Sequence, residues 1–296
     1  MKHIGIVGAG TMGAGIAQAA ALAELEVTLY DINTTVLRQS TEKIRTELKQ
    51  GIQKGKIPPE KLDPTLERIK PRTSISDLSS CDLILEAVIE DLRVKRDLFK
   101  RIEENAKSEA LLASNTSSLS ITAIASSLHR PGRFLGIHFF NPANIMKLVE
   151  VVRGRQTSDE VVGQGAAFAK KLGKTPVVVK DTPGFIVNRL ARPFYGEALR
   201  LLGEHVATVE QIDRIVKTSG DFAMGPFELM DLIGIDINLA VTQSIYDQYF
   251  GEPRFRPHPL QQEMVDAGWL GRKSGRGFYN YSESKNQQAS GTRKPT

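Results

Sequence analysis

The sequence predicts a doubly wound α/β domain of the Rossmann type followed by an all-α domain. Short apolar runs alternate with helical patterns in the first part of the chain, and a glycine-rich turn follows the first of these runs. No strand pattern occurs between Phe185 and about Tyr249. Pro183 and Gly184 separate the two patterns, so we expect one domain over residues 1–183 and a second over residues 184–296.

The expected strands of the first domain are continuous apolar runs, which are typical of parallel strands covered on both faces. They span residues 3–8, 27–31, 81–88, 111–115, 134–140 and 175–181. Residues 11–24, which are rich in alanine, and residues 34–50 have helical patterns. In the second domain, apolar spacing predicts helices over residues 185–205, 209–220 and 226–249. The polar segment from Ser282 onward is expected to be a disordered tail.

The composition is that of an ordinary globular protein. Hydrophobic residues make up 41% and charged residues 25% of the 296 residues, which excludes a collagen-like or wholly disordered chain. We expect no secretory signal and no membrane span, because no apolar run approaches the ~18 residues that a span requires. The one cysteine, Cys81, rules out an internal disulfide and favours a reducing compartment such as the cytoplasm.

The net charge of +5 is compatible with nucleic acid, a membrane surface or an anionic small molecule as partner. Aromatic residues make up only 6%, and lysine and arginine are interleaved with acids along the predicted helices. Nucleic-acid binding favours a clustered basic face with aromatic residues, so we do not expect it here. We assign part of the basic excess to small molecules that carry phosphate.

The glycine-rich turn, Gly8-Ala9-Gly10-Thr11-Met12-Gly13, lies between an expected strand and an expected helix, as a dinucleotide-binding loop should. Asp31 ends the second strand 18 residues after Gly13, close to the ~20 expected for the acid that binds the adenosine ribose. Asp31 would repel a 2′-phosphate, and the next residues include no arginine, so the pattern favours NAD over NADP. The alternative is an ordinary glycine turn and a solvated aspartate.

His138 is the histidine best placed for chemistry. It lies near the end of an apolar strand, before an Asn-Pro turn, and so at the carboxyl edge of the sheet, where α/β sites form. Glu150 follows within the apolar run LVEVV, where a carboxylate is costly to bury without a partner. A His138–Glu150 pair would remove that cost and orient the imidazole as a general base. A hydrogen-bonded core histidine is the equally simple alternative.

Two further polar positions have a structural and a functional interpretation. The segment SNTSSLSI, residues 114–121, follows a strand and either offers hydrogen-bond donors to a ligand or caps a helix beginning near Leu119, through Ser117 or Ser118. Asn188 lies among apolar residues at the start of the second domain and is either a ligand contact or a satisfied polar group at the domain interface.

Six segments, in the same order along the chain, resemble 3-hydroxyacyl-CoA dehydrogenases, short-chain 3-hydroxybutyryl-CoA dehydrogenases in particular. They are GIVGAGTMGAGIAQ, SNTSSLSI, HFFNPANIMKLVEVV, KDTPGFIVNR, MGPFELMDLIGID and LGRKSGRGFYNY. The resemblance implies an NAD-dependent, reversible oxidation of an (S)-3-hydroxyacyl-CoA to the 3-oxoacyl-CoA, in fatty-acid or related acyl-CoA metabolism. It also implies an acyl-CoA partner and a homodimer formed through the helical domain.

The resemblance implies roles for individual residues. His138 in HFFNP matches the catalytic base, and Glu150 in KLVEVV matches its partner. Ser117, the first serine of NTSS, matches a contact to substrate and nicotinamide, and Asn188 in FIVNR matches the second polar contact to the substrate.

For the cofactor, Asp31 matches the acid that binds the ribose. Glu90 and Lys95 in IEDLRVK match residues near the nicotinamide half, Asn141 in FFNP matches a further contact there, and Lys273 in GRKSGRGFY is a weaker match.

The basic end of the second predicted helix, with Lys54 and Lys56, resembles the CoA-binding segment of the family. The spacing of the histidines and acids indicates no metal site.

Other functions share parts of this pattern. A relative that oxidises a free hydroxy acid, such as a sugar acid, would keep the NAD site and the His–Glu pair. Within the CoA branch, 3-hydroxyadipyl-CoA is an alternative substrate that the sequence does not separate from 3-hydroxybutyryl-CoA. A structural protein that binds NAD without turnover is opposed by the intact set of Ser117, His138, Glu150 and Asn188.

Overall fold

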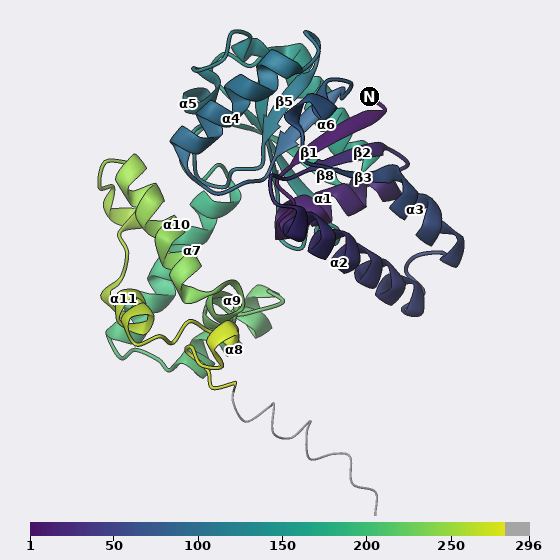
Figure 1. Ribbon diagram of the computed structural model, residues 1–296. Helices are drawn as coiled ribbons and strands as arrows, with labels where there is room; N and C mark the ends of the chain where they lie inside the picture. The colour runs from purple at the N-terminus through teal and green to yellow at the C-terminus, as the bar shows by residue number, and fades with distance from the viewer. Residues whose placement is uncertain (282–296) are drawn as a thin grey trace, which may run out of the picture. The chain divides into compact units, whose positions relative to one another are not determined.

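The computed structural model describes residues 1–281 and divides the chain into two compact units, one from Met1 to Phe185 and the other from Ile186 onward (Figure 1). The first contains a sheet with helices on both faces, and the second is built of helices. The tail expected to be disordered from Ser282 lies outside the described residues. The predicted fold class, a doubly wound α/β domain followed by an all-α domain, is confirmed.

The sheet of the α/β unit has the strand order β3-β2-β1-β4-β5-β6-β7-β8. The strands are β1 (His3–Val7), β2 (Glu26–Tyr30), β3 (Ile69–Arg72), β4 (Leu83–Glu86), β5 (Leu111–Ser114), β6 (Phe134–Phe139), β7 (Leu148–Arg153) and β8 (Thr175–Lys180). The strands from β3 to β6 pair in parallel, whereas β7 runs antiparallel to β6. The short link from β6 to β7 makes the sheet mixed, because no crossover helix intervenes.

Two layers of helices cover the sheet, and each closes its own apolar core. The helices are α1 (Thr11–Leu22), α2 (Thr34–Gln53), α3 (Leu62–Arg68), α4 (Leu92–Asn105), α5 (Ile121–Ala125) and α6 (Asp159–Lys171), with short 3-10 turns at Pro59–Lys61, Ile75–Leu78 and Pro131–Arg133. Side chains of α1, α2, α3 and α6 pack in one core, and those of α4 and α5 pack in the other. This is the arrangement of a doubly wound fold.

The expected strands differ from the observed ones in detail. The run at residues 81–88 contains only the four-residue strand β4, because its pairing with β1 and β5 ends at Glu86. β3, with the sequence Ile-Lys-Pro-Arg, is not among the expected strands; it is polar because it is an exposed edge of the sheet, where proline is tolerated.

The helical unit contains α7 (Val187–Gly203), α8 (Val209–Gly220), α9 (Pro226–Ile233), α10 (Ile235–Gln248) and α11 (Pro259–Asp266), with 3-10 turns at Pro253–Phe255 and Arg272–Ser274. The single helix expected over residues 226–249 is wrong. Gly234 ends α9 and precedes α10. Its φ of +103° is a backbone conformation that residues with a Cβ rarely adopt.

Two buried aspartates fasten the last described segment onto the helices of this unit. Asp231 of α9 accepts hydrogen bonds from the backbone N–H groups of Phe278 and Tyr279, at 3.0 and 2.9 Å, and from the Tyr281 hydroxyl at 3.0 Å. Asp213 of α8 accepts from the Tyr279 hydroxyl at 2.9 Å and from two N–H groups in the first turn of α9. Each carboxylate is thus satisfied by neutral donors.

Candidate active site

The predicted site residues of the α/β unit gather at one edge of its sheet. The carboxyl ends of parallel strands meet there, and this is where α/β folds bind ligands. The glycine loop follows β1, Asp31 follows β2, the segment with Glu90 follows β4, and the segment with Ser117 follows β5. His138 is the last residue but one of β6.

The glycine loop is tightly packed at two of its glycines and open at the third. Gly8 has a φ of +98°, and a Cβ on Gly13 would lie 1.8 Å from the carbonyl oxygen of Gly8. Around a Cβ on Gly10, by contrast, no atom beyond its chain neighbours lies within 4 Å. Gly10 is also the N-cap of α1 and has no side chain to cap Thr11 and Met12. A phosphate can therefore approach this end of the helix closely.

Asp31 is tied to the glycine loop by its own carboxylate. Oδ2 accepts a hydrogen bond from the Ala9 N–H at 2.8 Å, and Oδ1 accepts one from the Asn33 N–H at 2.9 Å. The remaining lone pairs of the two oxygens stay available as acceptors for ribose hydroxyls. Asp31, which was inferred from its spacing to the glycine loop, therefore lies next to that loop.

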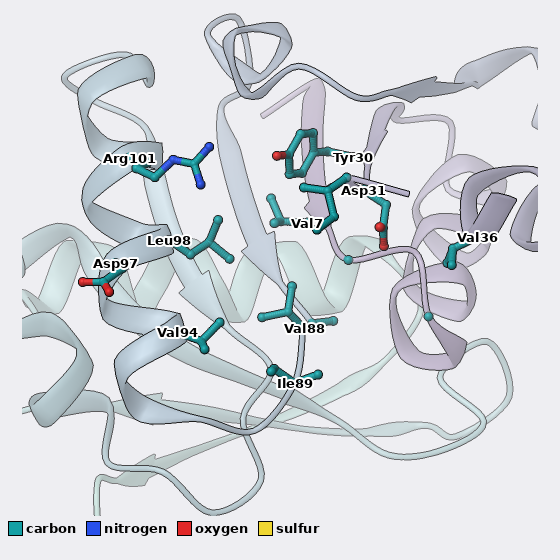
Figure 2. A pocket seen from close by; sticks show the side chains of 14 residues that line it. Val7, Tyr30, Asp31, Val36, Val88, Ile89, Val94, Asp97, Leu98 and Arg101 are labelled. Carbon is teal, nitrogen blue, oxygen red and sulfur yellow. The ribbon is translucent and has the colours of Figure 1, made fainter. Parts of the chain in front are cut away.

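A cavity of about 780 Å³ opens between the end of β2 and helix α4 (Figure 2). Figure 2 shows Val94 and Leu98 of α4 on one side and Tyr30 and Asp31 on the other, with Val88 between them. The lining residues are Val7, Gly8, Gly10, Tyr30, Asp31, Ile32, Val36, Ala87, Val88, Ile89, Val94, Asp97, Leu98 and Arg101. A largely apolar cleft of this size, with the Asp31 carboxylate beside the glycine loop, suits the adenosine half of a dinucleotide.

The glycine loop, the Asp31 acceptor and this cavity together fit NAD. Gly10 leaves room for the pyrophosphate, Asp31 offers acceptors to the ribose, and the apolar walls match an adenine ring. A 2′-phosphate beside Asp31 would meet a like charge, which agrees with the sequence-based preference for NAD over NADP.

Lys95 lies in a buried ion network behind this edge. Its Nζ is 2.5 Å from Oε1 of Glu86 and 3.2 Å from Oε2 of Glu90. Lys95 is 1% exposed and Glu86 is fully buried, and Oε2 of Glu86 accepts a further hydrogen bond from the Ser114 hydroxyl at 2.7 Å. Lys95 therefore acts on the site through Glu90, rather than by reaching a ligand itself.

Glu90 in turn holds the loop that carries Ser117. Its Oε1 accepts hydrogen bonds from the backbone N–H groups of Ser117 and Ser118, at 3.0 and 3.1 Å, and from the Thr116 hydroxyl at 2.5 Å. Burial opposes ionisation of Glu90, but the Lys95 ammonium and the hydroxyl donors outweigh it and lower the pKa of the carboxyl. An ionised Glu90 thus fixes the backbone of Ser117 at the edge of the sheet.

His138 and Glu150 form the predicted pair. They are direct cross-strand neighbours in the antiparallel register of β6 and β7, and Nδ1 of His138 is 2.7 Å from Oε2 of Glu150. Both side chains are buried, and the imidazole also packs against the rings of Phe140 and Phe185. With Nδ1–H donated to the carboxylate, Nε2 carries the lone pair, which is the tautomer that a general base needs.

Asn141 lies two residues beyond β6, in the exposed loop that links His138 to β7. Lys174 holds this loop: its buried Nζ donates to the carbonyl oxygens of Ala143 and Met146, at 2.7 and 2.8 Å. Burial, together with the like charge of Lys147, lowers the pKa of Lys174.

The other predicted residues belong to other elements of the chain. Asn188, half-buried in the first turn of α7, and Lys273, whose Nζ is 2.6 Å from Asp236, belong to the helical unit. Lys54 caps the carboxyl end of α2 and Lys56 follows it, and both are exposed. A helix of 20 residues is about 30 Å long, so these lysines lie far from the end of α2 that is next to Asp31.

Neither Ser117 nor Ser118 caps the helix that follows the NTSS segment, so this structural alternative is wrong. Helix α5 begins at Ile121, and its N-cap is Ser120, which accepts from the Ala123 N–H at 3.1 Å. Asp181 accepts the N–H groups of Ile121 and Thr122, at 3.0 and 2.7 Å. Ser117 is therefore not needed as a cap.

Sequence reasoning missed Glu86 and Lys174. Glu86 ends the apolar strand LILE, and a carboxylate in such a run carries the same signal that pointed to Glu150. Lys174 has no comparable signal, because an isolated lysine after a Leu-Gly turn is usually solvated.

Among the described residues, no three histidine, cysteine or acidic side chains gather as ligands of a metal ion would. Within the same part of the chain, no helix has the length and apolar character that crossing a membrane would require.

Comparison with protein families gives matches along nearly the whole described chain. The NAD-binding domain of 3-hydroxyacyl-CoA dehydrogenase matches residues 3–182, and the C-terminal domain of the same family matches residues 184–281.

Individual relatives are similar over most of this chain. The 3-hydroxyadipyl-CoA dehydrogenase of Escherichia coli K12 is 48% identical over 281 residues, which is 95% of this chain but 59% of that protein. A probable 3-hydroxybutyryl-CoA dehydrogenase of Deinococcus radiodurans is 44% identical over 94% of this chain and 99% of its own length. The chain thus spans about three fifths of the length of the first relative and nearly all of the second.

Solved structures show the same fold. The crystal structure of (S)-3-hydroxybutyryl-CoA dehydrogenase from Ralstonia eutropha has a TM-score of 0.92 at 44% identity, covering 95% of this chain and 99% of that one. A 3-hydroxybutyryl-CoA dehydrogenase structure from Escherichia coli K12 has a TM-score of 0.93 at 45% identity, covering all of this chain and 61% of the other.

Proposed function

The chain belongs to the 3-hydroxyacyl-CoA dehydrogenase family and carries its NAD-binding domain, and we propose that it oxidises (S)-3-hydroxybutyryl-CoA reversibly to acetoacetyl-CoA. The observation that carries the proposal is the buried pair of His138 and Glu150, 2.7 Å apart at the edge of the sheet that also holds the glycine loop and Asp31.

His138 and Glu150 perform the proton transfer in this proposal. Nε2 of neutral His138 takes the proton of the substrate 3-hydroxyl, and the Glu150 carboxylate stabilises the imidazolium that results. Bound NAD⁺ supplies the acceptor for the hydride on the same carbon. In the reverse direction, protonated His138 donates its proton to the 3-oxo oxygen.

Ser117 and Asn188 position the substrate in the same proposal. They hold its hydroxyl and thioester oxygens, so that the reacting carbon is correctly oriented. Glu90 fixes the backbone of Ser117 through the hydrogen bond at 3.0 Å. Exposed Lys54 and Lys56 attract the phosphates of CoA, which accounts for part of the positive charge.

For the cofactor, the proposal assigns the phosphates to the loop of Gly8, Gly10 and Gly13 and to the first turn of α1, with Thr11 and Met12. Asp31 binds the ribose. Glu90, Asn141 and Lys273 serve the nicotinamide half, with Lys95 acting behind Glu90.

Two alternatives keep the same chemistry. The relative named for 3-hydroxyadipyl-CoA favours a longer substrate with a second carboxylate. A free hydroxy acid, such as a sugar acid, is the other alternative, and turnover of 3-hydroxybutyrate compared with its CoA ester distinguishes it.

We also propose that the protein is a homodimer, with domains over residues 1–183 and 184–296. We place it in the cytoplasm, in fatty-acid or related acyl-CoA metabolism. The helical unit exposes apolar side chains of Leu190, Ile215, Phe222 and Phe250, the last of them 99% exposed, and such a surface favours association. The buried, unpaired Cys81 suits a reducing compartment. Light scattering of the purified chain measures its oligomeric state.

The test of the activity is NADH oxidation with acetoacetyl-CoA. His138→Gln should keep NADH binding and lose about 10²–10⁴-fold in turnover, the usual worth of general acid–base catalysis. His129→Gln, a change at an exposed histidine, is the control and should behave as wild type. Turnover of His138→Gln near that of the control would overturn the assignment, and preference for NADPH over NADH would overturn the role of Asp31.

A further inference from the structure

Arg192 of α7 is a buried cation with no anion beside it. It is 5% exposed, and no ion pair joins it to a carboxylate of the described residues. Its Nη1 donates to the backbone oxygen of Asn238 and to the Thr242 hydroxyl, both at 3.0 Å and both on α10. The guanidinium also lies over the Tyr195 ring, 5.0 Å from its centre. Neutral acceptors and an aromatic face compensate a buried guanidinium only in part, so an anionic partner would stabilise it further.

Donors around Arg192 point to the missing partner. Nε of Arg192 and Nδ2 of Asn238, the residue whose backbone oxygen accepts from Arg192, are buried and have no hydrogen-bond partner within residues 1–281. Oδ1 of Asn238 is already engaged, because it accepts from Gln261 at 2.7 Å. Both groups can donate a hydrogen bond. Buried donors beside a cation are complementary to an anionic acceptor, a carboxylate above all.

The position of Arg192 along α7 suggests where that carboxylate comes from. Asn188, which the proposed function makes a substrate contact, lies four residues earlier, so the two side chains share one face of the helix. Four residues of α-helix rise about 6 Å. In a six-carbon 3-hydroxyacyl chain with a terminal acid, the distal carboxylate lies three bonds beyond the reacting carbon. The length of these three bonds is comparable to the rise of the helix from Asn188 to Arg192.

We propose that Arg192, assisted by Asn238, binds the distal carboxylate of a dicarboxylic 3-hydroxyacyl-CoA and so sets the substrate class of the enzyme. The inference rests on the proposed function, since it takes Asn188 as a substrate contact. It favours a substrate such as 3-hydroxyadipyl-CoA over an uncharged chain of equal length. An uncharged terminus would leave the guanidinium and its neighbouring donors unpaired, and such sites discriminate strongly.

The first test uses the unmodified enzyme and NADH. The substrates are 3-oxoadipyl-CoA and 3-oxohexanoyl-CoA, which differ in a carboxylate against a methyl group, with acetoacetyl-CoA as reference. We expect kcat/KM to favour 3-oxoadipyl-CoA by about 10- to 100-fold, as for a hydrogen bond to a charged group. Equal values for the two six-carbon substrates, with acetoacetyl-CoA turned over, would overturn this inference alone. No turnover of any of the three would overturn the proposed function as well.

The second test changes the cation. Arg192→Met should abolish the preference for 3-oxoadipyl-CoA over 3-oxohexanoyl-CoA, and Arg192→Lys should restore part of that preference. Arg200→Met, on the same helix but paired with Glu197 at the surface, is the matched control and should keep the full preference. An equal loss with both six-carbon substrates in Arg192→Met would show that Arg192 only joins α7 to α10, and would overturn the proposal.

A third measurement does not depend on the folding of any variant. Adipyl-CoA and hexanoyl-CoA lack the 3-oxo group and compete with acetoacetyl-CoA for the unmodified enzyme. Stronger inhibition by adipyl-CoA, again by about 10- to 100-fold, supports the proposal, and equal inhibition overturns it.

Discussion

The two units bury their carboxylates with different partners. In the α/β unit, Glu86 lies against the Lys95 ammonium and Glu150 against the His138 imidazole, so each has a partner that is or can become a cation. In the helical unit, Asp213 and Asp231 accept hydrogen bonds from backbone N–H groups and tyrosine hydroxyls, and no ion pair reaches either one within the described residues.

The type of partner determines how burial affects the pKa of a carboxylate in each unit. A cationic partner helps to keep a buried carboxylate ionised. At Glu90, burial raises the pKa, but Lys95 and the hydroxyl donors of Thr116 and Ser118 together outweigh burial and lower it. With neutral partners, burial prevails and raises the pKa of Asp213 and of Asp231. The first arrangement holds a negative charge beside a group that is or can become a cation, whereas the second fastens a chain segment in place.

The largest expected effect comes from removing the charge beside His138. Glu150→Gln keeps the shape of the side chain but leaves the imidazolium without an anion, so turnover of acetoacetyl-CoA should fall by about 10²–10⁴-fold. The alkaline limb of the pH–rate profile for acetoacetyl-CoA reduction should also move to lower pH, because His138 must be protonated in this direction and the imidazolium loses its stabilising neighbour. Steady-state kinetics across pH measure both.

Glu160→Gln, at an exposed position of α6, is the control for this change and should leave rate and profile intact. If Glu150→Gln lowered the rate but did not shift the pH–rate profile, the His138–Glu150 pair would have only a structural role. The buried carboxylates of the two units would then not differ in catalytic function.

Lys95→Met should give the largest loss of stability. It removes the cation from the fully buried Glu86 carboxylate, and breaking a buried pair from one side costs about 3–5 kcal/mol. Urea unfolding of the NAD-free protein measures the loss. Lys100→Met, at an exposed position of the same helix, should cost little. Equal losses in the two variants would mean that the ion network contributes no more than surface charge.

In the helical unit, Asp231→Asn should have a smaller effect, about 1–3 kcal/mol. Three donors face Asp231, and an amide has only one oxygen to accept them, so at least one buried donor is left unpaired. Fluorescence of Trp269, the only tryptophan of the chain, reports unfolding of this unit. Asp266→Asn, exposed at the end of α11, is the control. A loss as large as that of Lys95→Met would contradict the distinction between charged and neutral partners.

Much of this organisation could be predicted from the sequence, where local chemistry alone determines it. The glycine loop and Asp31 are recognisable because a strand, a tight turn, a helix and an acid follow one another at fixed spacing. The pairing of His138 with Glu150 was inferred from the cost of a carboxylate in the run LVEVV, and the structure confirms their contact.

The missed features depend on tertiary structure. The antiparallel direction of β7 sets which residue faces His138, and no local pattern specifies strand direction. Gly234 divides the expected helix through a positive φ that apolar spacing does not reveal. Arg192 reads as an ordinary solvated arginine in the sequence, and its burial without an acid follows only from the packing of α7 against α10.

The smallest expected effect is a difference in the sign of two pH dependences. Burial opposes ionisation of Asp82 in the α/β unit. Hydrogen bonds from Lys107 and from the backbone N–H groups of Lys2 and His3 outweigh burial and lower the pKa of Asp82 below the usual 3.8. It therefore contributes stability above that pH and loses it on acidification. Burial raises the pKa of Asp231, so its contribution is present below 3.8 and is lost as the pH rises through the raised value.

Hydrogen exchange, followed separately in the two units of wild type, Asp82→Asn and Asp231→Asn, tests this prediction. Between about pH 3.5 and pH 7, the stability difference between wild type and Asp82→Asn should grow, and that between wild type and Asp231→Asn should shrink. Slopes of the same sign would mean that the partner of a buried or half-buried carboxylate, cation or neutral donor, does not decide its titration in this protein. Opposite slopes would extend the contrast seen at His138 and Lys95 to the stability of each unit.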